Sequence, residues 1–392
     1  MSLPPPPGSY GHQPPTGGQP GGGAPQPWSQ QPYPGGPSGP PPSGPPPWGP
    51  QQQWAGGPPP PSGGGKAKWI LGGLAAILAI ALVVVITVLV VRPDGGGNGP
   101  SNTGTNSSGS EFASANDTAP ANIITEDPTC EAWVKLSRDY ADSTKTIRWA
   151  DRDSSIPASA WTPDQRAMFE AAGRAMTRAA DQTVNLVKRT PHRTMRELYE
   201  QFIAYTRDFV KRIPSYAAKD DNVVAVANAI GNGLNNVCSA ISFGSAPPVA
   251  PLIAEPGPPS KISPLGDPKA PALFLNTVNS ECTGWSSMVA KFSKDTEAWL
   301  TVDAKIPATE WTSEQKAIND AVIPIMEANA DELERLGRAS GNPTFEDIAI
   351  LAAQYQRAYV TALPGYTAPD GFLAQSASFM VMTIDWACKA AS

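Results

Sequence analysis

The sequence predicts an all-α protein: a disordered proline-rich tail, one transmembrane helix, and two tandem four-helix bundles that are each closed by one disulfide. Three observations predict it. An uncharged apolar run covers residues 69–91, a long segment recurs about 150 positions later, and four cysteines fall at equivalent places in the two copies. Helical spacing of the apolar residues in each copy sets the fold class.

Residues 1–65 are mostly Pro, Gly, Gln and Ser, so they cannot bury a core, and we predict a disordered cytoplasmic tail. Aromatic residues are spaced through this tail: Tyr10, Trp28, Tyr33, Trp48 and Trp54. They favour a chain that docks into the grooves of protein partners. An inert low-complexity tail is the alternative.

Residues 69–91 form a run without charge that is long enough to span a bilayer as a helix. A cleaved signal peptide fits less well, because its apolar region is shorter and lies nearer the N-terminus. Lys66 and Lys68 precede the run and Arg92 follows it, which favours a cytoplasmic N-terminus. All four cysteines follow the run, where an oxidising exterior allows disulfides. We therefore expect a single-pass plasma-membrane protein with extracytoplasmic C-terminal domains.

Two segments are expected to act as linkers. Residues 92–127 are rich in Gly, Ser, Asn and Thr and predict a flexible connection, and residues 244–271 predict a stiffer proline-rich spacer. They leave two domains, repeat one at residues 128–243 and repeat two at residues 272–392.

The first 110 or so residues resemble the uncharacterised proline-rich single-pass envelope proteins of mycobacteria and related actinobacteria. The resemblance rests on the tail MSLPPPPGSYGHQPPTGGQP, the Lys-Ala-Lys-Trp entry into the apolar run, and the Gly/Asn/Ser linker. It is compositional and implies a cell-envelope location, and it carries over no functional residue.

The internal repeat is the most informative feature of the sequence. IPASAWTPDQRA at residues 156–167 returns as IPATEWTSEQKA at residues 306–317, and the offset of 150 continues without a gap to the last cysteine of each copy. Four segments per copy have helical apolar spacing, which predicts a four-helix bundle. Thr162 with Gln165, and Thr312 with Gln315, predict capping boxes at the second helix of each copy.

The cysteines test this arrangement. In an up-and-down bundle, the start of the first helix and the end of the fourth lie at the same end. Four cysteines allow three pairings, and the duplication selects Cys130 with Cys238 and Cys282 with Cys388.

No catalytic residue, metal site or cofactor site is predicted, because the outer region offers one histidine, His192, and no visible nucleophile and base set. We therefore predict that the protein is not an enzyme. Asp181 with Arg207, and Asp331 with Arg357, recur at equivalent helical positions. Interhelical ion pairs are the favoured interpretation, and a binding site is the alternative.

Charge separates the two copies. Residues 130–238 hold 16 Lys and Arg against 13 Asp and Glu, a net +3, whereas residues 282–388 hold 7 against 14, a net −7. A basic cluster surrounds the second turn of repeat one: Lys188, Arg189, Arg193 and Arg196. We hypothesise that it contacts anionic lipid or an envelope polymer. An ordinary solvated turn is one alternative, and docking of the basic repeat onto the acidic repeat is another.

These features favour a membrane-anchored binding or scaffolding protein of the cell envelope. Its outer bundles would engage a protein, a lipid or a wall component, and the tail would recruit protein partners; nucleic acid is not an expected partner. The alternatives are a signal-transducing receptor or regulator, and an envelope enzyme of unknown reaction.

Overall fold

The computed structural model describes residues 110–392; the predicted tail, the predicted span at residues 69–91 and most of the first linker lie outside them. The described chain is all-helical with two disulfides, which confirms the predicted fold class for this part. None of its helices combines the length and the apolar character that crossing a bilayer requires.

Each repeat contains four long helices and several short turns. The long helices of repeat one are α2 (Cys130–Thr146), α3 (Pro163–Arg189), α4 (Arg193–Arg212) and α5 (Asp221–Ser242). Those of repeat two are α7 (Cys282–Asp295), α8 (Ser313–Ala339), α9 (Pro343–Ala362) and α10 (Gly371–Ala390). A short helix, α6 (Ala246–Val249), follows α5, and single 3₁₀ turns lie at Trp149–Asp151, Ala158–Ala160, Ile213–Ser215, Ala218–Asp220, Ala250–Leu252, Trp299–Thr301, Ala308–Glu310, Leu363–Gly365 and Ala368–Asp370.

Local sequence signals place the helix ends. The Thr162 hydroxyl accepts from the Gln165 amide while the Gln165 side chain accepts from the Thr162 amide, and Thr312 with Gln315 does the same. Both predicted capping boxes are therefore confirmed.

Within each repeat the helices form a closed ring of neighbours. Helix α2 packs on α3, α3 on α4, α4 on α5, and α5 on α2, and repeat two follows the same order. This is the contact pattern of an up-and-down four-helix bundle.

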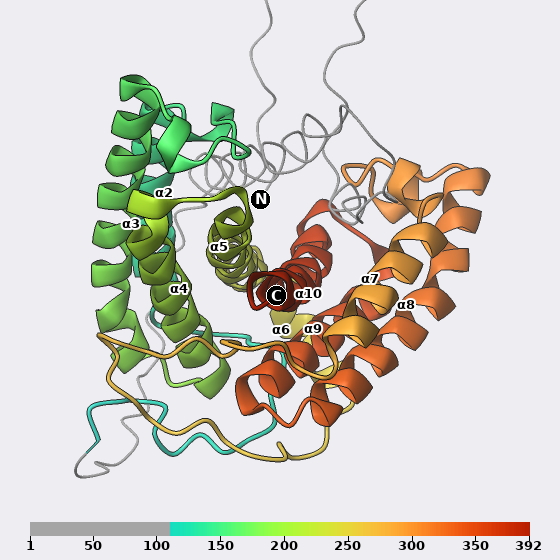
Figure 1. Ribbon diagram of the computed structural model, residues 1–392. Helices are drawn as coiled ribbons and strands as arrows, with labels where there is room; N and C mark the ends of the chain where they lie inside the picture. Colours follow the sequence, from blue (N-terminus) through green and yellow to red (C-terminus); the bar gives the residue numbers. More distant parts are fainter. Residues whose placement is uncertain (1–109) are drawn as a thin grey trace, which may run out of the picture. The chain divides into compact units, whose positions relative to one another are not determined.

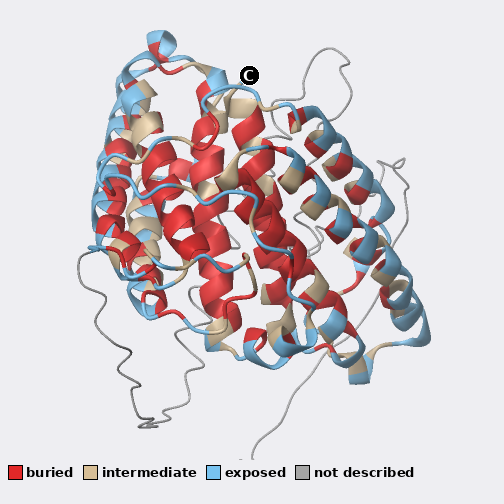
Figure 2. Cartoon of the chain, turned by 90° about the horizontal axis from the view of Figure 1, so that it is seen from below, coloured by how far each residue is buried: buried red, intermediate tan, exposed pale blue. Residues whose placement is uncertain are grey.

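The two repeats pack against each other through equivalent helices. Helix α5 packs on α10 more extensively than any other pair of elements does, and α4 also meets α9 (Figure 1). An interface that pairs like with like is the arrangement of a two-fold symmetric dimer. The buried apolar residues of both repeats consequently form one continuous core, and the exposed residues lie on the outer helices (Figure 2).

The two connecting segments cross between the repeats. We call residues 110–127 the N-terminal strap and residues 244–281 the linker strap. Tyr355 of repeat two bonds through its hydroxyl to Ile124 of the N-terminal strap, and its equivalent Tyr205 of repeat one donates to the Leu275 carbonyl of the linker strap. Each strap thus leads into its own repeat after packing on the third helix of the other. Phe112, Ile123 and Ile124 of the N-terminal strap and Phe274 and Leu275 of the linker strap are buried, whereas most of the predicted spacer at residues 244–271 is exposed.

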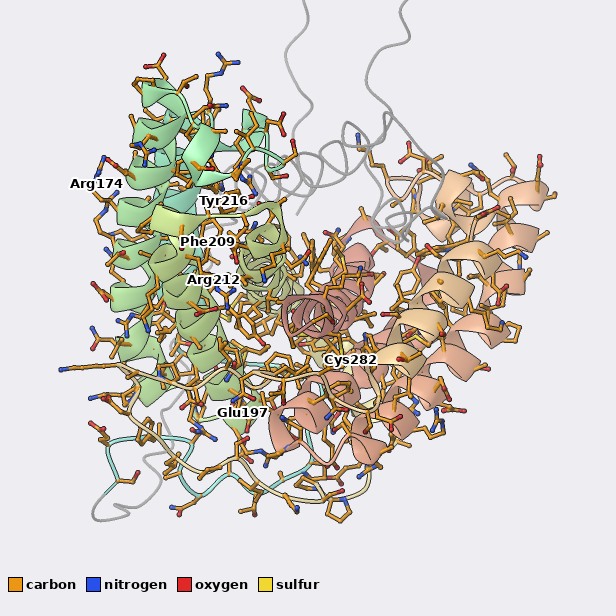
Figure 3. All side chains as sticks on the ribbon, viewed as in Figure 1. Arg174, Glu197, Phe209, Arg212, Tyr216 and Cys282 are labelled. Carbon is orange, nitrogen blue, oxygen red and sulfur yellow. A yellow bond between two sulfur atoms is a disulfide. The ribbon has the colours of Figure 1, made fainter. Side chains whose placement is uncertain are left out.

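Aromatic side chains close one end of repeat one. Trp161 stacks on Phe169 with ring centroids 4.0 Å apart, and Phe209 meets Tyr216 edge to face (Figure 3). The Tyr216 hydroxyl donates to the Ser154 carbonyl at 2.8 Å. Such packing ties the turn before α3 to the turn after α4.

Candidate functional site

The disulfides lie where the duplication places them. Cys130 is joined to Cys238, and Cys282 to Cys388, with Cα atoms 5.3 and 5.5 Å apart. Each bond connects the first helix of a repeat to its fourth.

The recurring acid and base pairs meet as ion pairs between the second and third helix of each repeat. Arg207 Nη2 lies 2.6 Å from Asp181, and Arg357 Nη2 lies 2.8 Å from Asp331. Both carboxylates are exposed, so the contacts belong to the surface of the helix pair.

The structure divides the basic cluster, and this corrects the hypothesis of one anionic-surface contact. Arg193 and Arg196 are about 1% exposed, whereas Lys188 pairs with Glu111 near the surface and Arg189 is exposed. The physical reason is that both guanidinium groups have buried acidic partners: Glu197 and Asp347 for Arg193, and Glu197 and Glu200 for Arg196. The docking alternative for the two repeats therefore describes the structure better.

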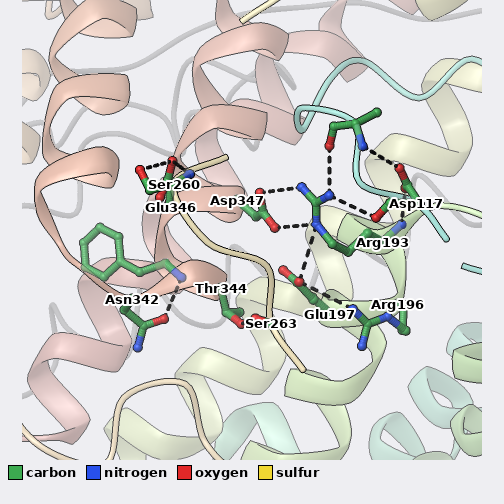
Figure 4. A network of polar contacts seen from close by, with 12 residues as sticks. Asp117, Arg193, Arg196, Glu197, Ser260, Ser263, Asn342, Thr344, Glu346 and Asp347 are labelled. Carbon is green, nitrogen blue, oxygen red and sulfur yellow. Dashed lines mark hydrogen bonds and ion pairs between the residues drawn. The ribbon is translucent and has the colours of Figure 1, made fainter. Parts of the chain in front are cut away.

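Arg193 lies at the contact between α4 and α9 (Figure 4). Its guanidinium donates two parallel hydrogen bonds to Asp347 of α9, each 2.9 Å long. It also donates to the carbonyls of Asp117 and Ala119 in the N-terminal strap. One side chain thereby fixes α4, α9 and the strap, with the planar geometry that favours arginine at such a position.

Two equivalent carboxylates face each other beside this arginine. Glu197 of α4 is the counterpart of Asp347 at the offset of 150, and both are at most 1% exposed. Burial, followed by the charge of Asp347, raises the pKa of Glu197 well above 4.5. Arg196 lies 3.6 Å from Glu197 and 3.2 Å from Glu200. Two carboxylates this close would repel each other if both were charged. Arg193, which has no basic counterpart in repeat two, places a positive charge beside both of them.

Repeat one also holds a cavity of about 450 Å³ between α2, α5 and the turn at Trp149. Its walls are aromatic and aliphatic, with a row of amide side chains from α5. The residues that line it include Trp133, Tyr140, Phe202, Asn228, Gly231 and Asn235. Burial raises the pKa of Tyr140 to about 12, so its phenol is neutral.

Several polar atoms around this cavity are buried and find no hydrogen-bond partner among the described residues. They are Trp133 Nε1, Trp149 Nε1, Asn228 Nδ2 and Asn235 Oδ1. The other end of the Asn235 amide donates to the Ser137 hydroxyl at 2.8 Å, which fixes its orientation. These atoms have almost no accessible surface, so they lie behind the wall of the cavity and do not face its open space.

The sequence carries a signal for this cavity. Asn228, Asn232 and Asn235 follow helical spacing along an otherwise apolar segment, and their counterparts in repeat two are Ser378, Met382 and Asp385. The two helices differ most at Asn232, where repeat two has the apolar Met382.

Residues 110–392 contain no group of three or more His, Cys, Asp and Glu placed to hold a metal ion. His192 lies at the start of α4, where its ring nitrogen bonds to the Glu126 carbonyl at 2.8 Å. That the protein is not an enzyme stays a prediction.

Comparison with known proteins places the described region in a family. The family model for the Mycobacterial ESX-1 associated protein matches residues 112–392. An uncharacterised protein of Mycolicibacterium smegmatis (strain MKD8) is 44% identical over 283 residues, which cover 72% of this chain and 75% of the relative. No solved structure matches. The mycobacterial side of the resemblance is thus confirmed, and the chain belongs to the Mycobacterial ESX-1 associated protein family.

Proposed function

We propose that this protein is a single-pass anchor of the cell envelope whose paired helical repeats form an extracytoplasmic binding and scaffolding platform. Residues 69–91 would span the plasma membrane, with the proline-rich tail in the cytoplasm. The observation that carries the proposal is that the two repeats, each closed by its own disulfide, share one continuous core. Disulfides persist in oxidising compartments, which supports a location outside the cytoplasm.

The joined repeats suit a scaffold because a partner meets both at once. Their sequences differ by charge, +3 in residues 130–238 against −7 in residues 282–388, so the platform offers two chemically different surfaces on one rigid support. The family description names an association with ESX-1. We propose that this chain also associates with ESX-1 components, and that the tail recruits protein partners inside the cell.

Topology is tested by labelling single added cysteines in mycobacterial spheroplasts with a membrane-impermeant maleimide. Ser107→Cys, after the predicted span, should be labelled in intact spheroplasts. Ser62→Cys, before it, should be labelled only after lysis. Labelling of Ser62→Cys alone in intact spheroplasts would show the opposite orientation. Equal labelling of both cysteines would show that residues 69–91 do not span the membrane.

Association is tested in intact cells with a photo-crosslinking amino acid at an exposed position of each repeat, Arg189 and Glu327. We expect ESX-1 components among the crosslinked proteins from at least one position. A matched probe at the buried Phe209 should capture none of them. Crosslinks restricted to cytoplasmic proteins would contradict the proposal.

A further inference from the structure

We propose that the cavity of repeat one is a binding site for an uncharged, largely apolar small molecule with an aromatic ring or a short apolar chain. This inference goes beyond the scaffold function, because it needs neither the membrane anchor nor an ESX-1 partner. It rests on the volume of the cavity, its aromatic and aliphatic walls and the absence of charge among its buried lining residues.

The size and walls of the cavity suit a small molecule. Its volume of about 450 Å³ falls in the range of ligand pockets. Trp133 and Phe202 meet edge to face with centroids 5.1 Å apart. Gly231 leaves room beside them, since a Cβ atom there would lie 3.5 Å from the Phe202 ring and 3.9 Å from Trp133. Aromatic walls of this kind favour a ring or a short apolar chain.

The distribution of charge argues that the bound molecule is neutral. The charged lining residues, Lys145, Arg148 and Asp151, are all exposed at the rim, and Arg148 is paired with Asp151 at 2.8 Å. The buried lining residues carry no charge. A charged group inside would therefore lose its hydration without gaining a counter-ion.

Repeat two shows how the same place looks when it is closed. Gly231 and Asn232 correspond to Val381 and Met382, which put larger side chains at these positions. Trp285, the counterpart of Trp133, donates to the Val381 carbonyl at 3.1 Å. Asp385, the counterpart of Asn235, accepts from Ser286 and pairs with Lys389. Larger side chains and completed hydrogen bonds thus occupy this place in repeat two.

The test uses the full-length, disulfide-bonded protein in lipid nanodiscs, and equilibrium dialysis with 2-naphthamide as the probe. The isosteric 2-naphthoate is the charged control, and empty nanodiscs correct for partition into lipid. We expect saturable binding of 2-naphthamide with a Kd on the order of 10–100 μM, and binding of 2-naphthoate at least about 10-fold weaker.

Two variants locate the probe. Gly231→Val, which copies repeat two, should abolish binding. Val381→Gly, the matched change in repeat two, should leave it unchanged. Far-UV circular dichroism and a thermal melt confirm that each variant is folded.

Two outcomes would overturn the proposal. One is the absence of saturable 2-naphthamide binding at 1 mM, or equal binding by folded Gly231→Val. The other is tighter binding of 2-naphthoate that is lost in Lys145→Ala, which would indicate an anionic amphiphile held at the rim. Either result leaves the topology and crosslinking tests of the scaffold function unaffected.

Discussion

Repeat one and repeat two share a skeleton but differ at the positions that carry chemistry. In both, the Ala-to-Tyr backbone hydrogen bond that closes the bundle end is 2.8 Å long, from Ala158 to Tyr216 and from Ala308 to Tyr366. In both, the indole of the following Trp donates to an Ile carbonyl at 2.9 Å. The disulfide and the capping box are shared as well.

The differences gather at two places. Repeat one has Arg193 where repeat two has Pro343, and only the arginine can join the two copies through Asp347. Repeat one has Gly231 where repeat two has Val381, and only the glycine leaves the cavity open. Caps, cysteines and core thus fix the duplicated backbone, while single divergent positions add the ion pair between α4 and α9 and open the cavity.

Removal of either disulfide should lower the free energy of unfolding the most, and by nearly the same amount in the two repeats. Replacing both cysteines of one repeat by serine should cost about 4–5 kcal/mol in the chain-entropy model, and the same in either repeat because the sequence separations are 108 and 106. Denaturant unfolding measures this. A clear difference between the losses of unfolding free energy in the two double variants would show that the two bundles do not depend equally on their disulfides.

Substitution of Arg193 should lower the free energy of unfolding by nearly as much. Arg193→Met leaves Asp347 buried without its partner and removes two bonds to the strap, so we expect a loss of about 3–5 kcal/mol. Arg207→Met is the matched control, because its partner Asp181 is exposed. A loss below about 1 kcal/mol for Arg193→Met would mean that apolar contacts alone join the repeats.

The equivalent carboxylates should respond with opposite signs. Burial raises the pKa of Glu197, so above pH 4.5 the folded chain holds a proton that the unfolded chain has lost. Stability should therefore fall as pH rises from about 4.5 through the folded pKa. Burial raises the pKa of Glu200 also, which adds a contribution of the same sign.

Glu197→Gln should therefore stabilise the protein at pH 7 by about 1 kcal/mol and flatten this slope. Asp347→Asn should destabilise it, because Arg193 then lacks its counter-ion. Urea unfolding at pH 4.5, 6 and 7.5 measures both. Equal destabilisation by the two substitutions would show that Glu197 is ionised and paired.

The surface ion pairs should give the smallest effects. Asp181→Ala and Asp331→Ala should each cost at most about 0.5 kcal/mol at low salt, because exposed pairs are solvated and screened. The loss should shrink further in 0.5 M NaCl. A loss above about 2 kcal/mol at either site would reveal a role beyond that of a surface pair.

Much of the fold could be predicted because it depends on local or duplicated signals. Thr162 and Gln165 mark a helix start whatever surrounds them, and the repeat selects one pairing of Cys130. The contact between the repeats depends on partners far away in the sequence. An arginine next to a turn, such as Arg193, is expected to be exposed to solvent. Only the structure shows that Asp347 of the other repeat faces it.

A weaker signal for the interface was present in helix α5. Its residues are buried all round, including Val224 and Ala227 beside the stripe of Val223 and Val226. Apolar residues that extend well beyond one stripe indicate a helix that packs against neighbours on more than one side. The cavity was harder to predict, because it follows from the absence of a side chain at Gly231.

The two repeats form one body through the packing of α5 on α10. A Cβ atom on Gly233 would lie 3.6 Å from the Cβ atom of Phe379, which is within the range for a disulfide. Gly233→Cys with Phe379→Cys should therefore form an inter-repeat bond on oxidation, seen by peptide mapping beside the two native bonds. Gly231→Cys with Phe379→Cys should not, because position 231 faces Phe202 within repeat one. Free thiols at 233 and 379 in folded, oxidised protein would contradict the account.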